Sequence, residues 1–142
     1  MQRPHIMSRF FLLVLILFPG VTFADIKIDH AWIKNLPPTV PVRAGYMSIS
    51  NTGSEAVSIL SVSSDAFLNI EVHETINQDG LMRMEHIPAL TIGPNSQLDL
   101  APGGIHLMMM NPHNPTIPGD KIRITFEFSD GSKQSLFFTV RK

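Results

Sequence analysis

Short runs in which apolar and polar residues alternate recur along the chain from residue 26 onward. The clearest is Lys121–Phe128, with the sequence KIRITFEF, in which every second residue is apolar. This period of two is typical of a strand with one buried and one exposed face. Eight further runs predict strands of the same kind: Ile26–Ile33, Gly45–Ser50, Val57–Val62, Leu68–Glu74, Leu81–Ile87, Gln97–Leu100, His106–Met110 and Gln134–Val140.

Turn-forming residues separate these runs, and no stretch has a convincing helical pattern. Two of the separators, Asp79-Gly80 and Asp130-Gly131, are Asp-Gly dipeptides, which are a strong signal for a tight hairpin. We expect Asn35–Arg43 (NLPPTVPVR) to be an extended surface loop, because its three prolines do not fit a central strand. The pattern therefore predicts a single all-β domain, a sandwich or barrel of about seven to nine strands.

The first 24 residues do not fit this pattern. Arg3 and Arg9 precede an unbroken apolar run, Phe10–Phe18, and small residues follow at Thr22 and Ala24. This order is typical of a cleaved secretory signal peptide. The run is shorter than the ~20 residues that span a bilayer. We therefore expect residues 1–24 to be removed and residues 25–142 to form the exported domain, without a membrane span. With no cysteine to carry a lipid, attachment through a lipobox is not expected.

Composition narrows the possible functions. The formal net charge of −1 and the 16% share of charged residues disfavour nucleic-acid binding, which requires a clustered basic face. The complete absence of cysteine excludes disulfide scaffolds, thiolate metal sites and blue-copper electron-transfer centres. The carboxylates are scattered, and no nucleophile–base pair stands out, so we do not expect an enzyme.

Histidine and methionine concentrate between residues 73 and 113. If Asp79-Gly80 is a two-residue hairpin turn, His73 lies opposite His86 and Met84 lies one step away on the same face. A looser turn would bring His73 directly opposite Met84. Both registers leave these two side chains on one face of the sheet, so the inference does not depend on the turn.

A second pair of candidate ligands follows in the next part of the chain. His106 and Met108 are two residues apart in a predicted strand and so point to the same side. Together with His73 and Met84 they make a neutral set of two imidazoles and two thioethers. Thioethers select copper(I), whereas calcium and magnesium prefer hard oxygen ligands. The sequence therefore predicts a site for one copper(I) ion.

Other histidines and methionines have more ordinary interpretations. Methionine in a strand is commonly core filler, and we assign Met47, Met82 and Met109 to that class. His30 is expected on the surface. Three residues remain candidates for competing or auxiliary ligands: His86, Met110 and His113. Glu74, next to His73, is a possible hydrogen-bond partner for it, although strand alternation points the two in opposite directions.

The spacing of the four candidate ligands is similar to the H-x10-M-x21-H-x-M signature of the PCuAC-type periplasmic copper(I) chaperones. The words HETINQDGLMRM, APGGIHLMMM, AGYMSISNTG and DHAWIK also resemble that family, so the likeness runs over nearly the whole chain after residue 25. The resemblance implies a cupredoxin-like β-sandwich that binds copper(I) near its surface through His73, Met84, His106 and Met108. No His/Met-rich tail follows the last predicted strand, so we expect no second copper site there.

The resemblance also implies a function and partners. It implies delivery of copper towards the CuA centre of cytochrome c oxidase, with transient contact to that subunit or to a Sco-type protein, and a location in the periplasm. A monomer is expected. Two alternatives stay open: a periplasmic copper-resistance or sequestration carrier, and a metal-free secreted interaction module.

Overall fold

The computed structural model describes residues 25–142, so the predicted signal peptide lies outside the described residues. Every regular element within this range is a β-strand, and none of it is a helix that could cross a membrane. The ten strands are β1 (Ile26–Lys34), β2 (Val42–Asn51), β3 (Val57–Ser63), β4 (Phe67–Gln78), β5 (Leu81–His86), β6 (Leu90–Ile92), β7 (Ser96–Leu100), β8 (Ile105–Pro112), β9 (Lys121–Phe128) and β10 (Lys133–Arg141).

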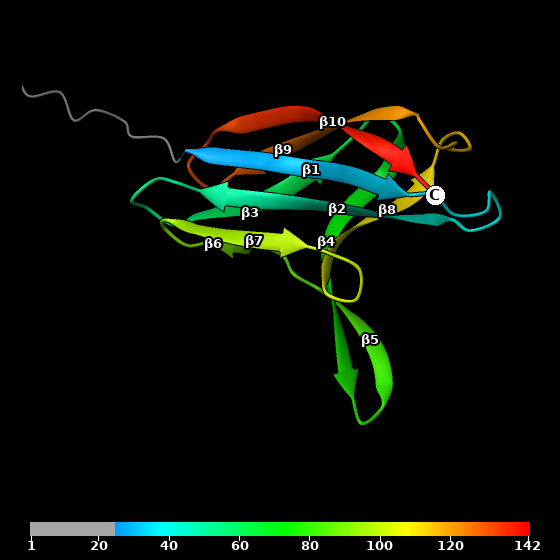
Figure 1. The fold of residues 1–142 in the computed structure, drawn as a ribbon, viewed down its shortest axis with the longest axis horizontal. Helices are drawn as coiled ribbons and strands as arrows, with labels where there is room; N and C mark the ends of the chain where they lie inside the picture. Colours follow the sequence, from blue (N-terminus) through cyan, green and yellow to red (C-terminus); the bar gives the residue numbers. More distant parts are fainter. Residues whose placement is uncertain (1–24) are drawn as a thin grey trace, which may run out of the picture.

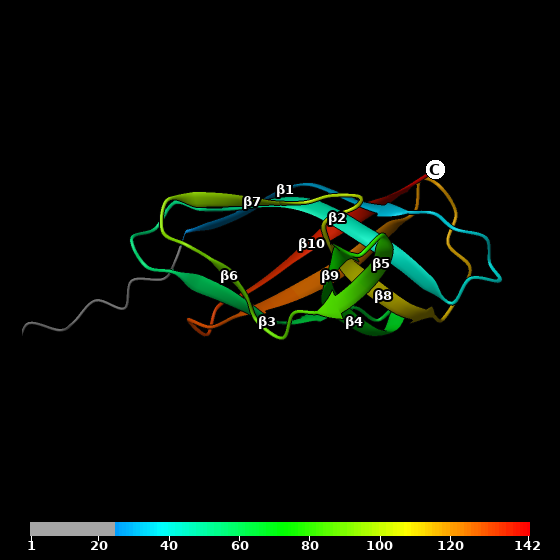
Figure 2. The same ribbon diagram turned by 90° about the horizontal axis from the view of Figure 1, so that it is seen from below.

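The strands form one sheet that closes on itself. Its order is β5-β4-β8-β2-β1-β10-β9-β3-β6, with β7 added beside β2. A pairing of Val62 in β3 with Ile70 in β4 closes the ring into a flattened barrel of two layers (Figures 1 and 2). β1 and β10 run parallel, and the other pairings are antiparallel. The second half of β4 and all of β5 extend beyond the barrel as a projecting hairpin (Figure 1).

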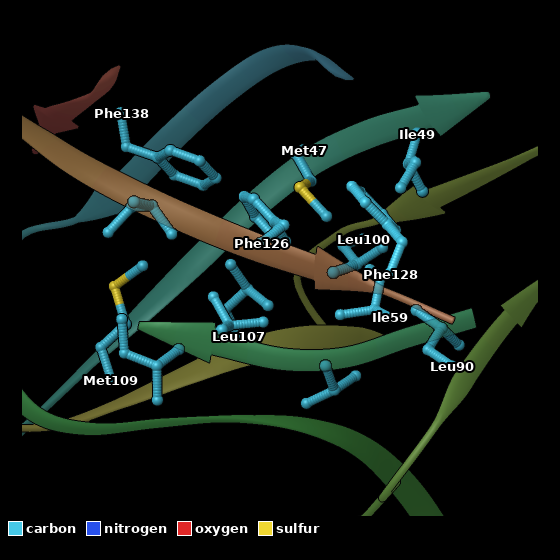
Figure 3. Packing of buried hydrophobic residues seen from close by; sticks show 14 of the residues in the cluster. Met47, Ile49, Ile59, Leu90, Leu100, Leu107, Met109, Phe126, Phe128 and Phe138 are labelled. Atoms are coloured by element: carbon cyan, nitrogen blue, oxygen red, sulfur yellow. The ribbon is translucent and has the colours of Figure 1, made fainter. Parts of the chain in front are cut away.

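The core lies between the two layers and fixes the direction of the neighbouring side chains. Leu107 and Met109 of β8 point inward and are fully buried, as Figure 3 shows together with Phe126 of β9. A Cβ at Gly45 would lie 3.2 Å from the Leu107 Cβ and 2.6 Å from the Met109 terminal methyl, so glycine allows β2 to approach β8 closely. Because strand residues alternate between faces, the residues between Leu107 and Met109 and on either side of them point outward.

All nine strands predicted from the sequence are present, with Lys121–Phe128 matching β9 at both ends. The tenth strand, Leu90–Ile92, was missed because three residues are too few to show an alternating pattern. The expected loop Asn35–Arg43 ends early, since β2 begins at Val42. Arg43 is a correction: it is 1% exposed, and its Nε donates a 2.8 Å hydrogen bond to Thr116 Oγ1.

Candidate metal centre

The projecting hairpin has the tight register expected from its Asp-Gly turn. Asp79 and Gly80 both have positive φ, at 55° and 80°, as a type I′ turn requires. His73 of β4 consequently pairs with His86 of β5, and Thr75 pairs with Met84. The looser alternative, which placed His73 directly opposite Met84, is therefore wrong.

Three imidazoles lie in a row across β5, β4 and β8. His73 sits in the middle strand, opposite His86 on one side and His106 on the other. The ring centroids are 5.6 Å apart for His73 and His86, and 6.2 Å apart for His73 and His106. The row lies at the base of the β4–β5 hairpin, where the hairpin projects from the barrel. A pocket of about 270 Å³ opens beside it, with His86 and Glu71 in its lining.

One ring nitrogen of His73 is held by a neighbour, and the other has no partner. The Nε2 lies 2.8 Å from Oε2 of Glu71, whose other oxygen accepts a 2.9 Å bond from Asn69. A carboxylate can only accept, so Nε2 carries a proton, and in the neutral ring Nδ1 then keeps a free lone pair. Nδ1 is buried and makes no hydrogen bond to any of the described residues. A buried polar atom without a partner is costly, and a bound metal ion would satisfy it.

The Glu71 carboxylate is held in its charged form by the same contacts. The hydrogen bond from His73 is the largest cause that lowers the pKa of the Glu71 carboxyl below its ordinary value, and the bond from Asn69 adds to it. A carboxylate that fixes one ring nitrogen is the usual way in which proteins orient a metal-binding histidine and raise its basicity.

His106 has a similar arrangement with a different partner. Its Nδ1 lies 3.0 Å from the carbonyl oxygen of Gly104, which also accepts a 3.2 Å bond from the Thr75 amide. Because a carbonyl only accepts, Nδ1 carries a proton, and in the neutral ring Nε2 keeps its lone pair. The residue is 5% exposed, so its ring is held in place by its surroundings. His73 and His106 thus each present one unprotonated nitrogen.

The predicted thioether ligands share this face but not the same position on it. Met84 pairs with Thr75, towards the tip of the hairpin, and is 61% exposed. Met108 pairs with Glu71, on the barrel side of the row, and is half-buried. Each is a diagonal neighbour of His73, on opposite sides. The structure therefore brings His73 and His106 together, and its register places Met84 and Met108 on the same face on opposite sides of His73.

The remaining histidines and methionines divide between core and surface. Met47 and Met109 are buried, as predicted. Met82 is a correction: it is 64% exposed, because it points to the same outer face as Met84. Met110 continues that face beyond Met108, opposite Asn69. The residues His30 and His113 are exposed. Across the described residues, no three histidine, aspartate or glutamate side chains are grouped closely enough to hold an ion by themselves.

Glu71 is the residue that the sequence reasoning missed. Glu74 was considered for this role, but it pairs with Glu85 and Ile105 on the opposite face of the strand. The alternation of strand residues could have identified Glu71, because residues 71 and 73 lie on the same face of the strand whereas residues 73 and 74 lie on opposite faces.

Comparison with known protein sequences identifies a family and two relatives. The family model described as "Putative lipoprotein LpqE-like" matches residues 26–140. A protein named "Putative lipoprotein Lxx21020" from Leifsonia xyli is 32% identical over 124 residues, covering 87% of this chain and 74% of that protein. "Uncharacterized protein RP573" from Rickettsia prowazekii is 33% identical over 116 residues, covering 78% of this chain and 64% of its own length.

Solved structures confirm the predicted all-β, cupredoxin-like fold. The copper-bound PCuAC domain from PmoF2 superimposes with a TM-score of 0.70 at 21% identity, covering 82% of this chain and 92% of that one. The solution structure of CuI-DR1885 from Deinococcus radiodurans gives a TM-score of 0.67 at 25% identity, covering 81% of this chain and 76% of that one. The resemblance of the sequence to PCuAC-type proteins is therefore confirmed, and the three-dimensional likeness establishes the fold.

Proposed function

Because the chain belongs to the LpqE-like family, we propose that it is an exported metallochaperone that binds one copper(I) ion through His73, Met84, His106 and Met108. The observation that carries this proposal is the pair of neighbouring imidazoles with one free nitrogen each. The buried Nδ1 of His73 is the sharper half of that observation, because no group among residues 25–142 donates a hydrogen bond to it and its lone pair is available to a metal ion.

The chemistry of the face supports copper(I) as the ion. Two neutral imidazoles and two thioethers contribute no negative charge, which suits a monovalent soft ion better than a divalent one. The names of the structural neighbours describe one domain as copper-bound and another as its CuI form. The region between the two imidazoles is where an ion would meet both nitrogens, with the long methionine side chains approaching from either side.

Accessibility supports delivery rather than permanent storage. The β4–β5 hairpin projects from the barrel (Figure 1). Met84 belongs to its β5 strand and is 61% exposed, so a recipient's own ligands can reach the ion from that side and replace Met84 first. Neutral thioethers are weak ligands and exchange more readily than thiolates. We propose that the recipient is the CuA centre of cytochrome c oxidase, reached directly or with a Sco-type protein, and that the exchange takes place in the periplasm.

A competition titration with copper(I) against a chromogenic chelator tests the site. Wild-type protein should bind one tight equivalent. Glu71→Gln should weaken the affinity by about tenfold, because loss of the partner that orients a ligating histidine typically costs that much or more. Glu74→Gln, which makes the same chemical change on the opposite face, should leave the affinity unchanged. Equal effects of the two substitutions would argue against ligation through His73 Nδ1.

A strain lacking the gene separates delivery from sequestration. Delivery predicts a loss of cytochrome c oxidase activity that added copper restores, because the enzyme then receives its metal without the chaperone. Oxidase activity and copper tolerance should both be measured in the deletion strain and in a strain complemented with the wild-type gene. Normal oxidase activity together with increased copper sensitivity would support the sequestration carrier instead, and no phenotype in either assay would favour the metal-free module.

A further inference from the structure

The β5 strand forms a free edge of the sheet. It stands at one end of the strand order, with β4 on one side and, among residues 25–142, no strand on the other. All six of its residues are exposed, including Leu81 and Met82 at 64% each. It contains no proline and pairs with β4 in an unbroken register. Proteins normally protect such edges with prolines, bulges or covering elements, because an open edge can pair with another strand.

The pairing of β5 with β4 fixes which residues of β5 point their backbone N–H and C=O groups towards β4 and which point them away. The amide of Ile87 donates a 2.8 Å bond to the carbonyl of Val72, so positions 81, 83, 85 and 87 direct their backbone groups towards β4. The alternate positions therefore direct their backbone groups away from the sheet. These are Met82, Met84 and His86, whose amides and carbonyls line the open edge.

The charged residues of this hairpin are arranged unfavourably within one copy. Glu74 of β4 lies directly opposite Glu85 of β5, a placement of like charges that destabilises a pair of strands. Arg83 is the basic residue of β5, and its own partner across the hairpin is Ile76. Among residues 25–142, none of Glu74, Arg83 and Glu85 forms an ion pair.

We propose that two copies of this chain form a symmetric dimer by antiparallel pairing of their β5 strands, centred on Met84. In this register Arg83 of each copy lies opposite Glu85 of the other, so each arginine joins a row that contains Glu85 and Glu74. The backbone groups that pair are those of Met84 with Met84 and of Met82 with His86, which are the groups that point outward. The register that pairs Arg83 with Glu85 is therefore the same twofold register that pairs the outward-pointing backbone groups.

A second copy suits this edge because the strand is complementary to itself. An unrelated partner strand would have to supply a matching acid and base at the same spacing, whereas β5 supplies both. This proposal differs from the monomer that the sequence analysis expects. The dimer would join the outer faces of the two hairpins into one surface, with the methionine-rich sides of both copies adjacent. The pairing uses backbone groups and charges, so it does not require bound copper.

Sedimentation equilibrium of the metal-free protein, over about two decades of concentration, tests this proposal. Wild-type mass should rise towards that of two chains. Arg83→Glu and Glu85→Arg should each raise the dimer dissociation constant by about tenfold or more, since each creates two like-charge contacts per dimer. The double variant Arg83→Glu/Glu85→Arg should restore association, because it exchanges the charges and keeps their pairing.

Lys34→Glu is the matched control, because it makes the same change in charge on β1, which is already paired on both sides. It should associate like the wild type. A wild-type mass that stays at one chain throughout would overturn the dimer. Association that the single substitutions leave unchanged, or that the double variant fails to restore, would overturn this register and point to a different contact. Circular dichroism of each variant checks that the strands are intact.

Discussion

Replacing both His73 and His106 by alanine is expected to abolish tight copper(I) binding. These two imidazoles lie side by side on paired strands at the base of the hairpin, with ring centroids 6.2 Å apart. Without them the face retains thioethers, which are weak ligands on their own and bind well only around an ion that stronger ligands hold. A competition titration against a copper(I) chelator should therefore show one equivalent for the wild type and none for the double variant.

The control for this experiment uses histidines outside the site. His30→Ala/His113→Ala removes two exposed imidazoles and should keep the full equivalent of copper(I). Because His106 is 5% exposed, its removal leaves a small cavity, and thermal unfolding of the metal-free double variant should be recorded to confirm that it is folded. Retention of tight binding by the folded His73→Ala/His106→Ala variant would contradict the proposed ligand set.

The local features of the site were predictable because they depend on neighbours in the sequence. The Asp79-Gly80 turn fixes the register of β4 and β5, and the alternation of strand residues puts His106 and Met108 on one side. The pairing of β4 with β8 places His106 beside His73, although these two residues are 33 positions apart in the sequence. The sequence suggested it only indirectly, through the matching chemistry of the two histidine–methionine pairs and the spacing of the family signature.

The features that were missed depend on contacts across the fold. Arg43 was expected in a surface loop, yet its Nε bonds to Thr116, which is 73 residues away in the sequence. The exposure of Met82 follows from the hairpin projecting beyond the barrel, and a methionine that packs in the core has the same local pattern.

Replacing Met84 or Met108 by leucine is expected to weaken copper(I) binding by tenfold or more while leaving the fold nearly as stable. Leucine fills a similar volume but has no sulfur, so it removes only the ligand. Met84 is 61% exposed, and its substitution should change the free energy of unfolding by less than about 0.5 kcal/mol. Substitution of the half-buried Met108 should lower the free energy of unfolding by less than about 1.5 kcal/mol. Copper(I) competition and chemical denaturation, measured on the same preparations, separate the two effects.

The same face provides a matched control for each substitution. Met82 lies two residues from Met84 towards the hairpin tip, and Met110 lies two residues beyond Met108, both further from the imidazole row. Met82→Leu and Met110→Leu should therefore leave the copper(I) affinity unchanged. If Met82→Leu weakened binding as much as Met84→Leu, the assignment of Met84 rather than Met82 as the β5 ligand would be contradicted. If neither Met84→Leu nor Met108→Leu had an effect, the ion would be held by imidazoles alone, and His86, beside His73, would be the next ligand to test.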